Sequence, residues 1–228
     1  MGEIHEDITL RDRAPVFRDR EDAGGRLGRY LATFPGLDDP LACPIPAGGI
    51  PVGIAVARIL GCPVRPIVVR KIQIPWNTEA GFGAVTWDGR VFLNRDLVSR
   101  LRLTPDQVES ATSKARASVR ERAERFSLRG PLPDPAGRSC ILVDDGLASG
   151  YTMAAACQAL RPLNPRKIVV AVPTGSLSSV TRVAELADEV ICLNIRTGGS
   201  FAVADAYEEW YDLTEREVED LLGDAEKV

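Results

Sequence analysis

One stretch of the sequence combines acidic, small and hydroxyl residues in an order that suits a ligand site. In residues 139–152, SCILVDDGLASGYT, an apolar run ends in Asp144 and Asp145, and a flexible segment then leads into an expected helix. At the carboxyl end of a parallel strand, the NH groups of such a loop and the positive end of the helix dipole converge on one point, which suits a phosphate. Ser149 and Thr152 would add hydroxyl donors. The carboxylates can accept hydrogen bonds from vicinal hydroxyls, so the stretch predicts a site for a sugar phosphate.

The elements that must position this stretch alternate between strand and helix. Expected strands at residues 140–144, 167–172 and 189–193 are separated by expected helices at residues 151–160 and 177–186. Alternation at this spacing is typical of a parallel sheet. We therefore expect an α/β fold with an open, mainly parallel twisted sheet and helices on both faces.

A strand, a tight turn and a buried helix are expected earlier in the chain. The segment ACPIPAGGIPVGIAVARILG turns at Gly48 and Gly49 and continues into an apolar helix. The β-branched run at residues 66–70 predicts a central strand. Ligands of such sheets bind where the strands end. We therefore expect the site at the carboxyl ends of the strands near residues 46, 70 and 144.

Two further patterns follow the run at residues 66–70. Residues 83–94 alternate around Asp88-Gly89, which predicts a hairpin. Residues 104–127 predict a long helix, because Thr104 and Gln107 can form a capping box at its start. The surrounding segment, residues 95–129, carries an excess of basic residues, which we interpret as the solvated face of a surface helix, with a phosphate-attracting role as the alternative.

Both ends of the chain predict helices. Residues 17–31 carry apolar positions among charges and predict a helix despite Gly24 and Gly25. Near the other end, Thr214 and Glu217 can form a second capping box, so a helix is expected there. The strongly acidic composition of this last segment indicates a solvated helix.

Composition excludes several functional classes. The 228 residues include 28 Lys or Arg and 32 Asp or Glu, for a net charge of −4, which argues against a globally basic nucleic-acid binder. The longest uncharged stretch, residues 40–57, is too rich in proline and glycine to span a bilayer. The N-terminus lacks the apolar region of a secretory signal. We expect a cytoplasmic protein with neither membrane nor nucleic-acid partners.

Cysteine and histidine offer little chemistry. The five cysteines show no C-x-x-C spacing and lie mostly in apolar runs, so we interpret them as small buried hydrophobic residues. The single histidine, His5, lies near an end that we expect to be frayed. A Ser-His or Cys-His mechanism is therefore not expected. The sequence names no general acid or base and no protein metal site.

Residues 141–152, ILVDDGLASGYT, resemble the 5-phosphoribosyl-1-pyrophosphate (PRPP) signature of type I phosphoribosyltransferases. They depart from it at Gly146, where the family usually has an aliphatic residue. The segments FRDREDAG, PIPAGGIPVG, VVRK, VFLN and AxxEWYxL are similar to a bacterial and archaeal branch of predicted phosphoribosyltransferases of unknown acceptor. This resemblance implies one domain over residues 1–228. It implies a core at about residues 38–195 and a small hood, beside the acceptor, from about residues 1–37 and 196–228.

The resemblance also implies roles for the residues of the signature. Asp144 and Asp145 would bind the ribose 2′ and 3′ hydroxyls. The 5′-phosphate would lie in the loop of Ala148, Ser149, Gly150 and Thr152. The remaining members of the substrate-binding segment would be Gly146, Leu147 and Tyr151.

A second loop, Ala47-Gly48-Gly49, resembles the pyrophosphate loop of the family. A strained peptide there often turns its NH group toward pyrophosphate, which glycine tolerates. The related branch more often has arginine where this chain has Ala47, so one cation is missing. Backbone NH groups, Mg²⁺ carried mainly by PRPP, Arg70 and Lys71 would then neutralise the pyrophosphate.

Some functional candidates have a structural alternative. Residues 73–82 occupy the place of the family's mobile lid, although Trp76 and Asn77 could equally belong to a surface turn. Four aromatic residues could stack on an acceptor base or could belong to the core: Phe201, Tyr207, Trp210 and Tyr211.

The leading hypothesis is Mg²⁺-dependent transfer of phosphoribosyl from PRPP to the nitrogen of a nucleobase or similar small acceptor, releasing pyrophosphate. The alternative is a PRPP-sensing regulator of the same fold without useful catalysis. Ala47 and Gly146 suggest this alternative, because both depart from the pattern of the family. A phosphoacceptor receiver domain would place its acidic pair near the first strand, and Asp144 and Asp145 come too late for that. The expected partners are PRPP and its acceptor. The sequence does not decide between a monomer and a homodimer.

Overall fold

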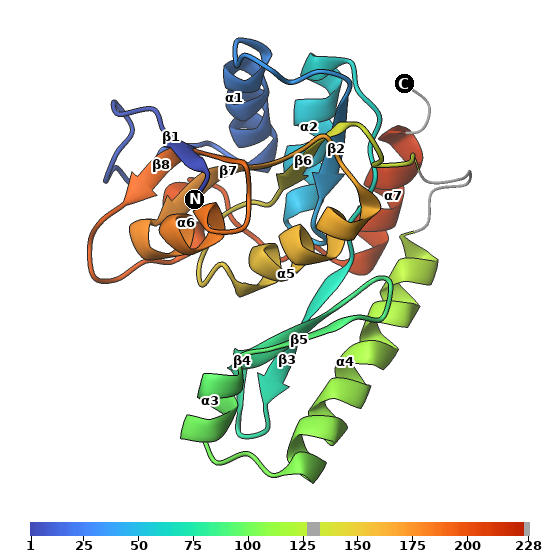
Figure 1. Cartoon of the computed structure of the whole chain (residues 1–228). Coiled ribbons are helices and arrows are strands. Elements are labelled where there is room, and N and C mark those ends of the chain that lie inside the picture. The colour runs from blue at the N-terminus through green and yellow to red at the C-terminus, as the bar shows by residue number, and fades with distance from the viewer. Residues whose placement is uncertain (127–132, 226–228) are drawn as a thin grey trace.

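A five-stranded parallel sheet forms the centre of the computed structural model, which describes residues 1–126 and 133–225. The spatial order of its strands is β1-β8-β7-β6-β2, and every neighbouring pair is parallel. The strands are β1 (Glu3–His5), β2 (Pro40–Pro44), β6 (Ser139–Val143), β7 (Lys167–Ser176) and β8 (Glu189–Arg196). The sheet is open, and the expected α/β architecture is confirmed (Figure 1).

Helices cover both faces of this sheet. They are α1 (Arg20–Ala32) and α2 (Gly49–Leu60) on one face, and α5 (Tyr151–Leu160) and α6 (Leu177–Ala184) on the other. Successive residues of a strand point to opposite faces, so Ile141 packs with residues of α1 and α2, whereas Leu142 packs with residues of α5 and α6. Burial on both faces explains why β6 is a continuous apolar run.

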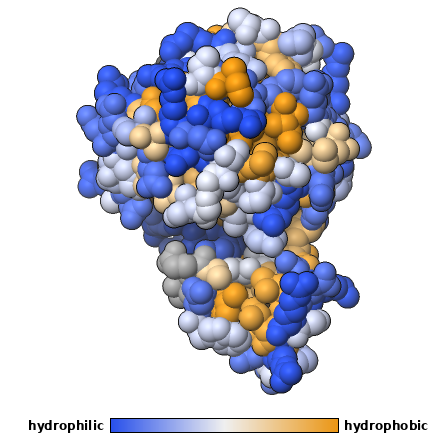
Figure 2. Space-filling view, turned by 90° about the vertical axis from the view of Figure 1, so that its left-hand side faces the viewer, coloured by the Kyte–Doolittle hydropathy of each residue, from blue (hydrophilic) through white to orange (hydrophobic). Residues whose placement is uncertain are grey.

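A separate arm, residues 69–125, projects from the parallel sheet (Figure 1). Its three-stranded antiparallel sheet contains β3 (Val69–Ile74), β4 (Asn77–Thr86) and β5 (Val91–Leu93), and its helices are α3 (Arg95–Arg100) and α4 (Pro105–Arg125). Phe82 of β4 and Val119 of α4 share one apolar cluster with Ile50 of α2 and with Leu222 near the C-terminus, so the core of the arm continues into the main body. Figure 2 shows the arm as the narrower lower part of the molecule, with hydrophobic and hydrophilic residues side by side on the visible face.

The prediction of a central strand at residues 66–70 is wrong. The preceding segment follows the edge of the parallel sheet, where Arg65 N donates to Ala42 O at 2.8 Å and Ile67 N donates to Pro44 O at 2.9 Å. The chain then leaves this sheet, and β3 pairs antiparallel with β4 in the arm. A β-branched run is buried in both settings, so the pattern could not separate them.

The predicted capping boxes and hairpin are confirmed. Gln107 N donates to Thr104 Oγ1 at 3.2 Å, and Thr104 N donates to Gln107 Oε1 at 2.9 Å. The last residue of the expected helix, residue 127, lies outside the described residues. Gly89, with φ of 81°, turns β4 into β5. Thr214 and Glu217 cap the final helix, α7 (Glu215–Ala225).

The two ends of the chain are held against the sheet and against each other. The prediction of a frayed N-terminus is wrong, because β1 pairs with β8 and His5 Nε2 lies 2.8 Å from Glu189 Oε2. The expected helix 17–31 begins later, at Arg20. The residues before it pair with the C-terminal segment, where Glu208 N donates to Phe17 O at 2.8 Å.

None of the helices in the described ranges is both long and apolar enough to cross a membrane. All five cysteines are free, and four are buried, as expected for small apolar residues; Cys62 is half-buried.

The close packing of α1 on α2 gives a test of the fold. A Cβ on Gly24 would lie 2.6 Å from Val52 O and 2.7 Å from Ala55 Cβ. We expect Gly24→Val to lower the free energy of unfolding by about 3 kcal/mol, because the two helices must separate. The matched control is Gly25→Ala, whose Cβ would meet only Arg29 Nη1, at 3.5 Å. The control should be neutral or stabilising by about 0.5–1 kcal/mol in urea unfolding.

Candidate functional site

A cleft of about 710 Å³ lies where strands of the parallel sheet end beside the arm. Three segments that are distant in sequence line it: residues 45–48 after β2, residues 69–71 at the start of β3, and residues 144–150 after β6. Side chains of Arg20 and Arg122 complete two of its walls. The structure thus brings the acidic pair, the glycine loop and the two predicted cations to one cavity.

The loop after β6 presents an uncapped helix N-terminus to this cleft. Gly150, Thr152 and Met153 line the cleft, and no side chain caps α5 at this end. The first NH groups of a helix lack partners within the helix, and the helix dipole adds positive potential there. This end of the cleft therefore suits an anion of the size of a phosphate.

Backbone geometry and anchoring contacts hold the loop in this shape. Gly150 has φ of 74°, and a Cβ there would lie 3.2 Å from Ser179 O, so only glycine fits without strain. The buried Leu147 accepts from Ser176 N at 3.2 Å and donates its own NH to Thr174 O at 2.9 Å. These two hydrogen bonds hold the loop against β7. Ser149 is exposed and lines the cleft.

Arg20 binds the acidic pair from the first turn of α1. Its Nε donates to Asp145 Oδ2 at 2.9 Å, and its Nη1 donates to Tyr211 O at 2.8 Å. The guanidinium lies 3.9 Å from the centre of the Trp210 ring, which is a close cation–π contact. The exposed fractions of the Arg20 and Asp145 side chains are 9% and 14%, so this ion pair is largely excluded from water.

Burial raises the pKa of both acids. Burial and the neighbouring Asp145 carboxylate raise the pKa of Asp144 well above its ordinary value. Burial also raises the pKa of Asp145, although the charge of Arg20 and its hydrogen bond oppose that shift. Asp144 Oδ1 accepts from Asp145 N at 2.9 Å. The two carboxyls therefore lie against each other, and among the described residues Arg20 forms an ion pair with them through Asp145.

The C-terminal aromatic residues differ in position. Tyr207 is buried and donates its hydroxyl to Asp145 O at 2.6 Å, so it supports the acidic loop. Trp210 lines the cleft, with Arg20 on its ring. Tyr211 is 57% exposed, and neither it nor Phe201 lines the cleft.

Gly48 packs directly against the acidic pair. A Cβ there would lie 1.9 Å from Asp145 Oδ2, and a Cβ on Gly49 would lie 2.6 Å from Val143 O. The expected reason for glycine at position 48 is wrong: its φ of −58° and ψ of −33° suit any residue. Glycine is needed for close approach. The neighbouring Pro46–Ala47 peptide is cis.

The arm supplies the positive side of the cleft. Arg70 and Lys71 line it from β3, and Arg122 lines it from the last turn of α4. Burial lowers the pKa of Arg70, and the charge of Arg122 lowers it further. The sequence prediction included Arg70 and Lys71 but not Arg122, which sits in a helix that was interpreted as a solvated face.

Other predicted residues lie beside the cleft. The Tyr151 side chain is outside its lining, 4.6 Å from the Arg182 guanidinium. Residues 73–82 comprise the end of β3, the turn after it and the first part of β4. Trp76, in the turn, is 61% exposed. Arg20 was not predicted as a site residue from the sequence. It lies in FRDREDAG, one of the segments that carried the resemblance, and that segment could have pointed to it.

The fold and this loop define a class of protein. Residues 89–207 match the sequence model of the phosphoribosyl transferase domain, which covers just over half of the chain. The chain belongs to the phosphoribosyl transferase family.

Particular relatives agree with this assignment. Proteins from two strains of Mycobacterium tuberculosis, CDC 1551 and H37Rv, are provisionally named phosphoribosyl transferases and are 37% identical over 212 residues, or 93% of this chain. This chain spans about half the length of those relatives, at 47%. A crystal structure from Thermus thermophilus is 35% identical, with a TM-score of 0.77, covering 92% of this chain and 98% of that one.

The buried ion pair predicts a strong effect of removing its cation. We expect Arg20→Met to lower the free energy of unfolding by about 3 kcal/mol, because Asp145 is then left largely buried without a counter-charge. The control is Arg26→Met, on the same helix, whose ion pair with Asp22 is more exposed. Equal effects of the two substitutions on urea unfolding would contradict the role given to Arg20.

The raised pKa of Asp144 predicts a pH-dependent stability. The folded protein binds this proton more tightly than the unfolded chain, so ionisation of Asp144 costs stability as the pH rises above about 4, the ordinary aspartate value. Asp144→Asn removes that cost. The variant should melt at a higher temperature than wild type at about pH 8, and the difference should shrink toward about pH 3.5. A difference that is independent of pH would contradict the raised pKa.

Proposed function

We propose that the chain is a phosphoribosyltransferase that moves phosphoribosyl from PRPP to a nitrogen of a nucleobase or similar small acceptor and releases pyrophosphate. The single observation that carries this proposal is one cleft that joins an uncapped helix N-terminus, an acidic pair and a cationic arm. PRPP has a phosphate, two ribose hydroxyls and a diphosphate, which match those three features in chemistry.

Each wall of the cleft then has a role in binding. The NH groups of residues 148–152, with the hydroxyls of Ser149 and Thr152, would hold the 5′-phosphate. Asp144 and Asp145 would accept hydrogen bonds from the ribose hydroxyls, and Arg20 would keep Asp145 in place. In the same proposal, the loop of residues 47–49 with Arg70 and Lys71 holds the diphosphate.

The residues of the cleft fit a magnesium ion that arrives with the substrate. Within the described ranges, the group of metal-ligating side chains found close together is Glu3, His5 and Glu189, which lies on β1 and β8 away from the cleft. Magnesium prefers oxygen ligands and retains waters, so diphosphate oxygens can carry it, with the Asp144 and Asp145 carboxylates nearby. When bound, the ion would neutralise charge on the leaving diphosphate.

The chain's own groups would act mainly through electrostatics. If the bond from C1 to the diphosphate breaks before the acceptor bonds, positive charge develops on the ribose and negative charge on the leaving group. The acidic pair faces the ribose in this arrangement, and the cations of the arm face the leaving group. The reaction needs no histidine or cysteine nucleophile, since the work lies in stabilising these two charges.

The acceptor would bind beside Trp210 and Arg20, where the N-terminal and C-terminal segments meet. We propose that these segments form the hood of a single domain. Arg20 already occupies a face of the Trp210 ring, so an acceptor would need to use the other face or the edge of that ring.

A PRPP-sensing protein of the same fold is the second candidate. Ala47 favours it, because this loop lacks the cation that the related branch more often carries. The two candidates differ in turnover and share PRPP binding.

One experiment tests the proposal. The protein is incubated with PRPP, Mg²⁺ and a panel of nucleobases, and pyrophosphate and nucleotide formation are followed. Release of pyrophosphate that depends on one base supports the transferase, whereas PRPP binding without turnover supports the sensor. A protein that does not bind PRPP contradicts both.

Gly48 gives a sharper prediction for the loop. Gly48→Ala should weaken PRPP binding at least about tenfold, because its Cβ displaces the Asp145 carboxylate from its present position. The control is Gly198→Ala, where a Cβ would meet no atom within 4 Å. Calorimetry with the folded variants provides the measurement. Wild-type affinity in Gly48→Ala would show that this contact is not part of the binding site.

A further inference from the structure

Arg70 and Arg122 bring two guanidinium groups to the same wall of the cleft. Arg70 lies in β3 and Arg122 in the last turn of α4, and both line the cavity. They are close enough for the charge of Arg122 to disfavour the charged form of Arg70. Two like charges in a partly buried place repel each other, and an anion between them would remove that repulsion.

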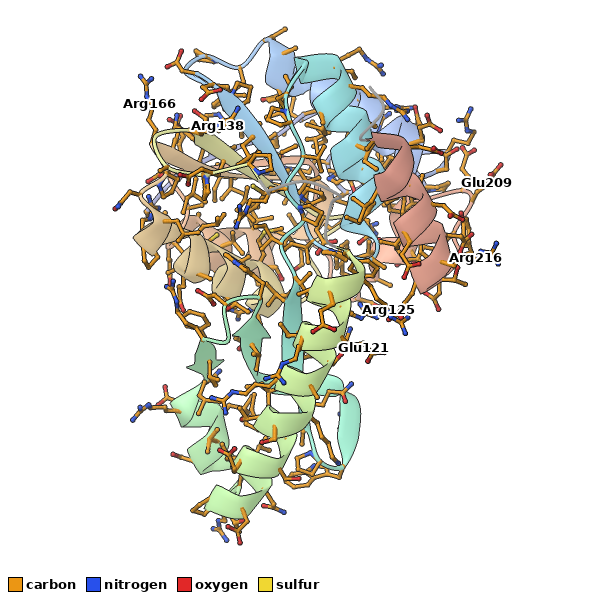
Figure 3. All side chains as sticks on the ribbon, turned by 90° about the vertical axis from the view of Figure 1, so that its right-hand side faces the viewer. Glu121, Arg125, Arg138, Arg166, Glu209 and Arg216 are labelled. Carbon is orange, nitrogen blue, oxygen red and sulfur yellow. The ribbon has the colours of Figure 1, made fainter. Side chains whose placement is uncertain are left out.

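The acids of the chain neutralise this pair only in part. Glu215, the first residue of α7, lies 3.2 Å from Arg122 Nε through its Oε1, and it also pairs with Arg125. Figure 3 shows Arg125 at the end of α4 that lies beside α7. The carboxylate of Glu215 therefore forms ion pairs with Arg122 and Arg125, and its charge also acts on Arg70. Asp212 also lines the cleft, and the acidic pair belongs to another wall, where Asp145 is bound by Arg20.

Donors on this wall remain without acceptors. Within residues 1–126 and 133–225, the structure records no acceptor for the Arg70 side chain and none for the terminal nitrogens of Arg122. Glu215 holds Arg122 through Nε, which leaves the two terminal nitrogens available. A guanidinium fixed in this way can bind an oxyanion through two parallel hydrogen bonds.

We propose that Arg122 binds the diphosphate of PRPP together with Arg70, and so supplies from the arm the cation that Ala47 does not supply from its loop. This inference rests on the proposed function. Two guanidiniums that line one wall suit the larger charge of a diphosphate. The single phosphate has its own place at the N-terminus of α5.

Glu215 is a positioning residue in this arrangement. It pairs with Arg122 at the base of α7, and so joins the C-terminal helix to the cleft wall. Arg125 shares Glu215 but does not line the cleft, and its side chain is 45% exposed. Arg125 is therefore a matched control: it shares the carboxylate and the helix end, and differs in facing away from the cavity.

The test is calorimetric titration of Arg122→Ala and Arg125→Ala with three ligands in Mg²⁺ buffer: PRPP, inorganic pyrophosphate and ribose 5-phosphate. In Arg122→Ala, affinity for PRPP and pyrophosphate should fall at least about tenfold, the loss expected for charged hydrogen bonds. Affinity for ribose 5-phosphate should stay within about twofold of wild type. Arg125→Ala should bind all three ligands as wild type does.

A second variant guards against a failure to fold. Arg122→Lys keeps the charge but loses the paired donors, so it should show an intermediate loss for PRPP and pyrophosphate. Wild-type pyrophosphate affinity in Arg122→Ala overturns the inference, as does an equal loss for ribose 5-phosphate or an equal effect of Arg125→Ala. Failure of the proposed function has a different result, because the wild-type protein then binds no PRPP at all.

Discussion

The carboxylate of Asp145 is the point on which the site depends. It follows a strand that is buried on both faces, and a carboxylate that is only 14% exposed needs a cation and hydrogen bonds. Arg20 supplies the charge from α1, and Gly48 lets the loop after β2 approach. Tyr207 binds the backbone carbonyl of the same residue. One acid thereby fixes the relative positions of the N-terminal helix, a second strand-end loop and the C-terminal segment.

The features that the sequence could predict are those set by local pattern. The alternation of strands and helices, the Thr104 capping box, the Asp88-Gly89 turn and the loop after β6 all depend on residues within a few positions of each other. The strand at residues 66–70 failed because its place depends on pairing, and apolar runs look alike in either sheet. Arg20 could not be chosen over the other arginines, because its burial depends on an acid 125 residues away in sequence.

Glycine illustrates the same limit. Gly24, Gly48 and Gly150 are identical in the sequence, yet each is required for a different reason: helix contact, contact with a carboxylate, and a positive φ. Only the last reason is a local property of the backbone, and it was the kind of reason expected for Gly48. The other two come from neighbours in space. A pattern can therefore predict that glycine matters at a position without predicting what approaches it.

Charge in the cleft is separated in a way that the overall composition conceals. The net charge of −4 is spread over the whole chain, whereas the cleft has its acidic pair at the end of β6, bound by Arg20, and two further guanidiniums, of Arg70 and Arg122, on the arm. A ligand with neutral hydroxyls between a phosphate and a diphosphate would complement the acidic pair, the N-terminus of α5 and the cationic arm at once, as the proposed PRPP does. The cluster that packs the arm also contains Ile50 of α2 and Val218 of α7, so the cations of the arm are held in place relative to the sheet. In the proposed arrangement, the loop with Ala47 needs no cation of its own, because Arg70 and Arg122 would supply the charge from the arm.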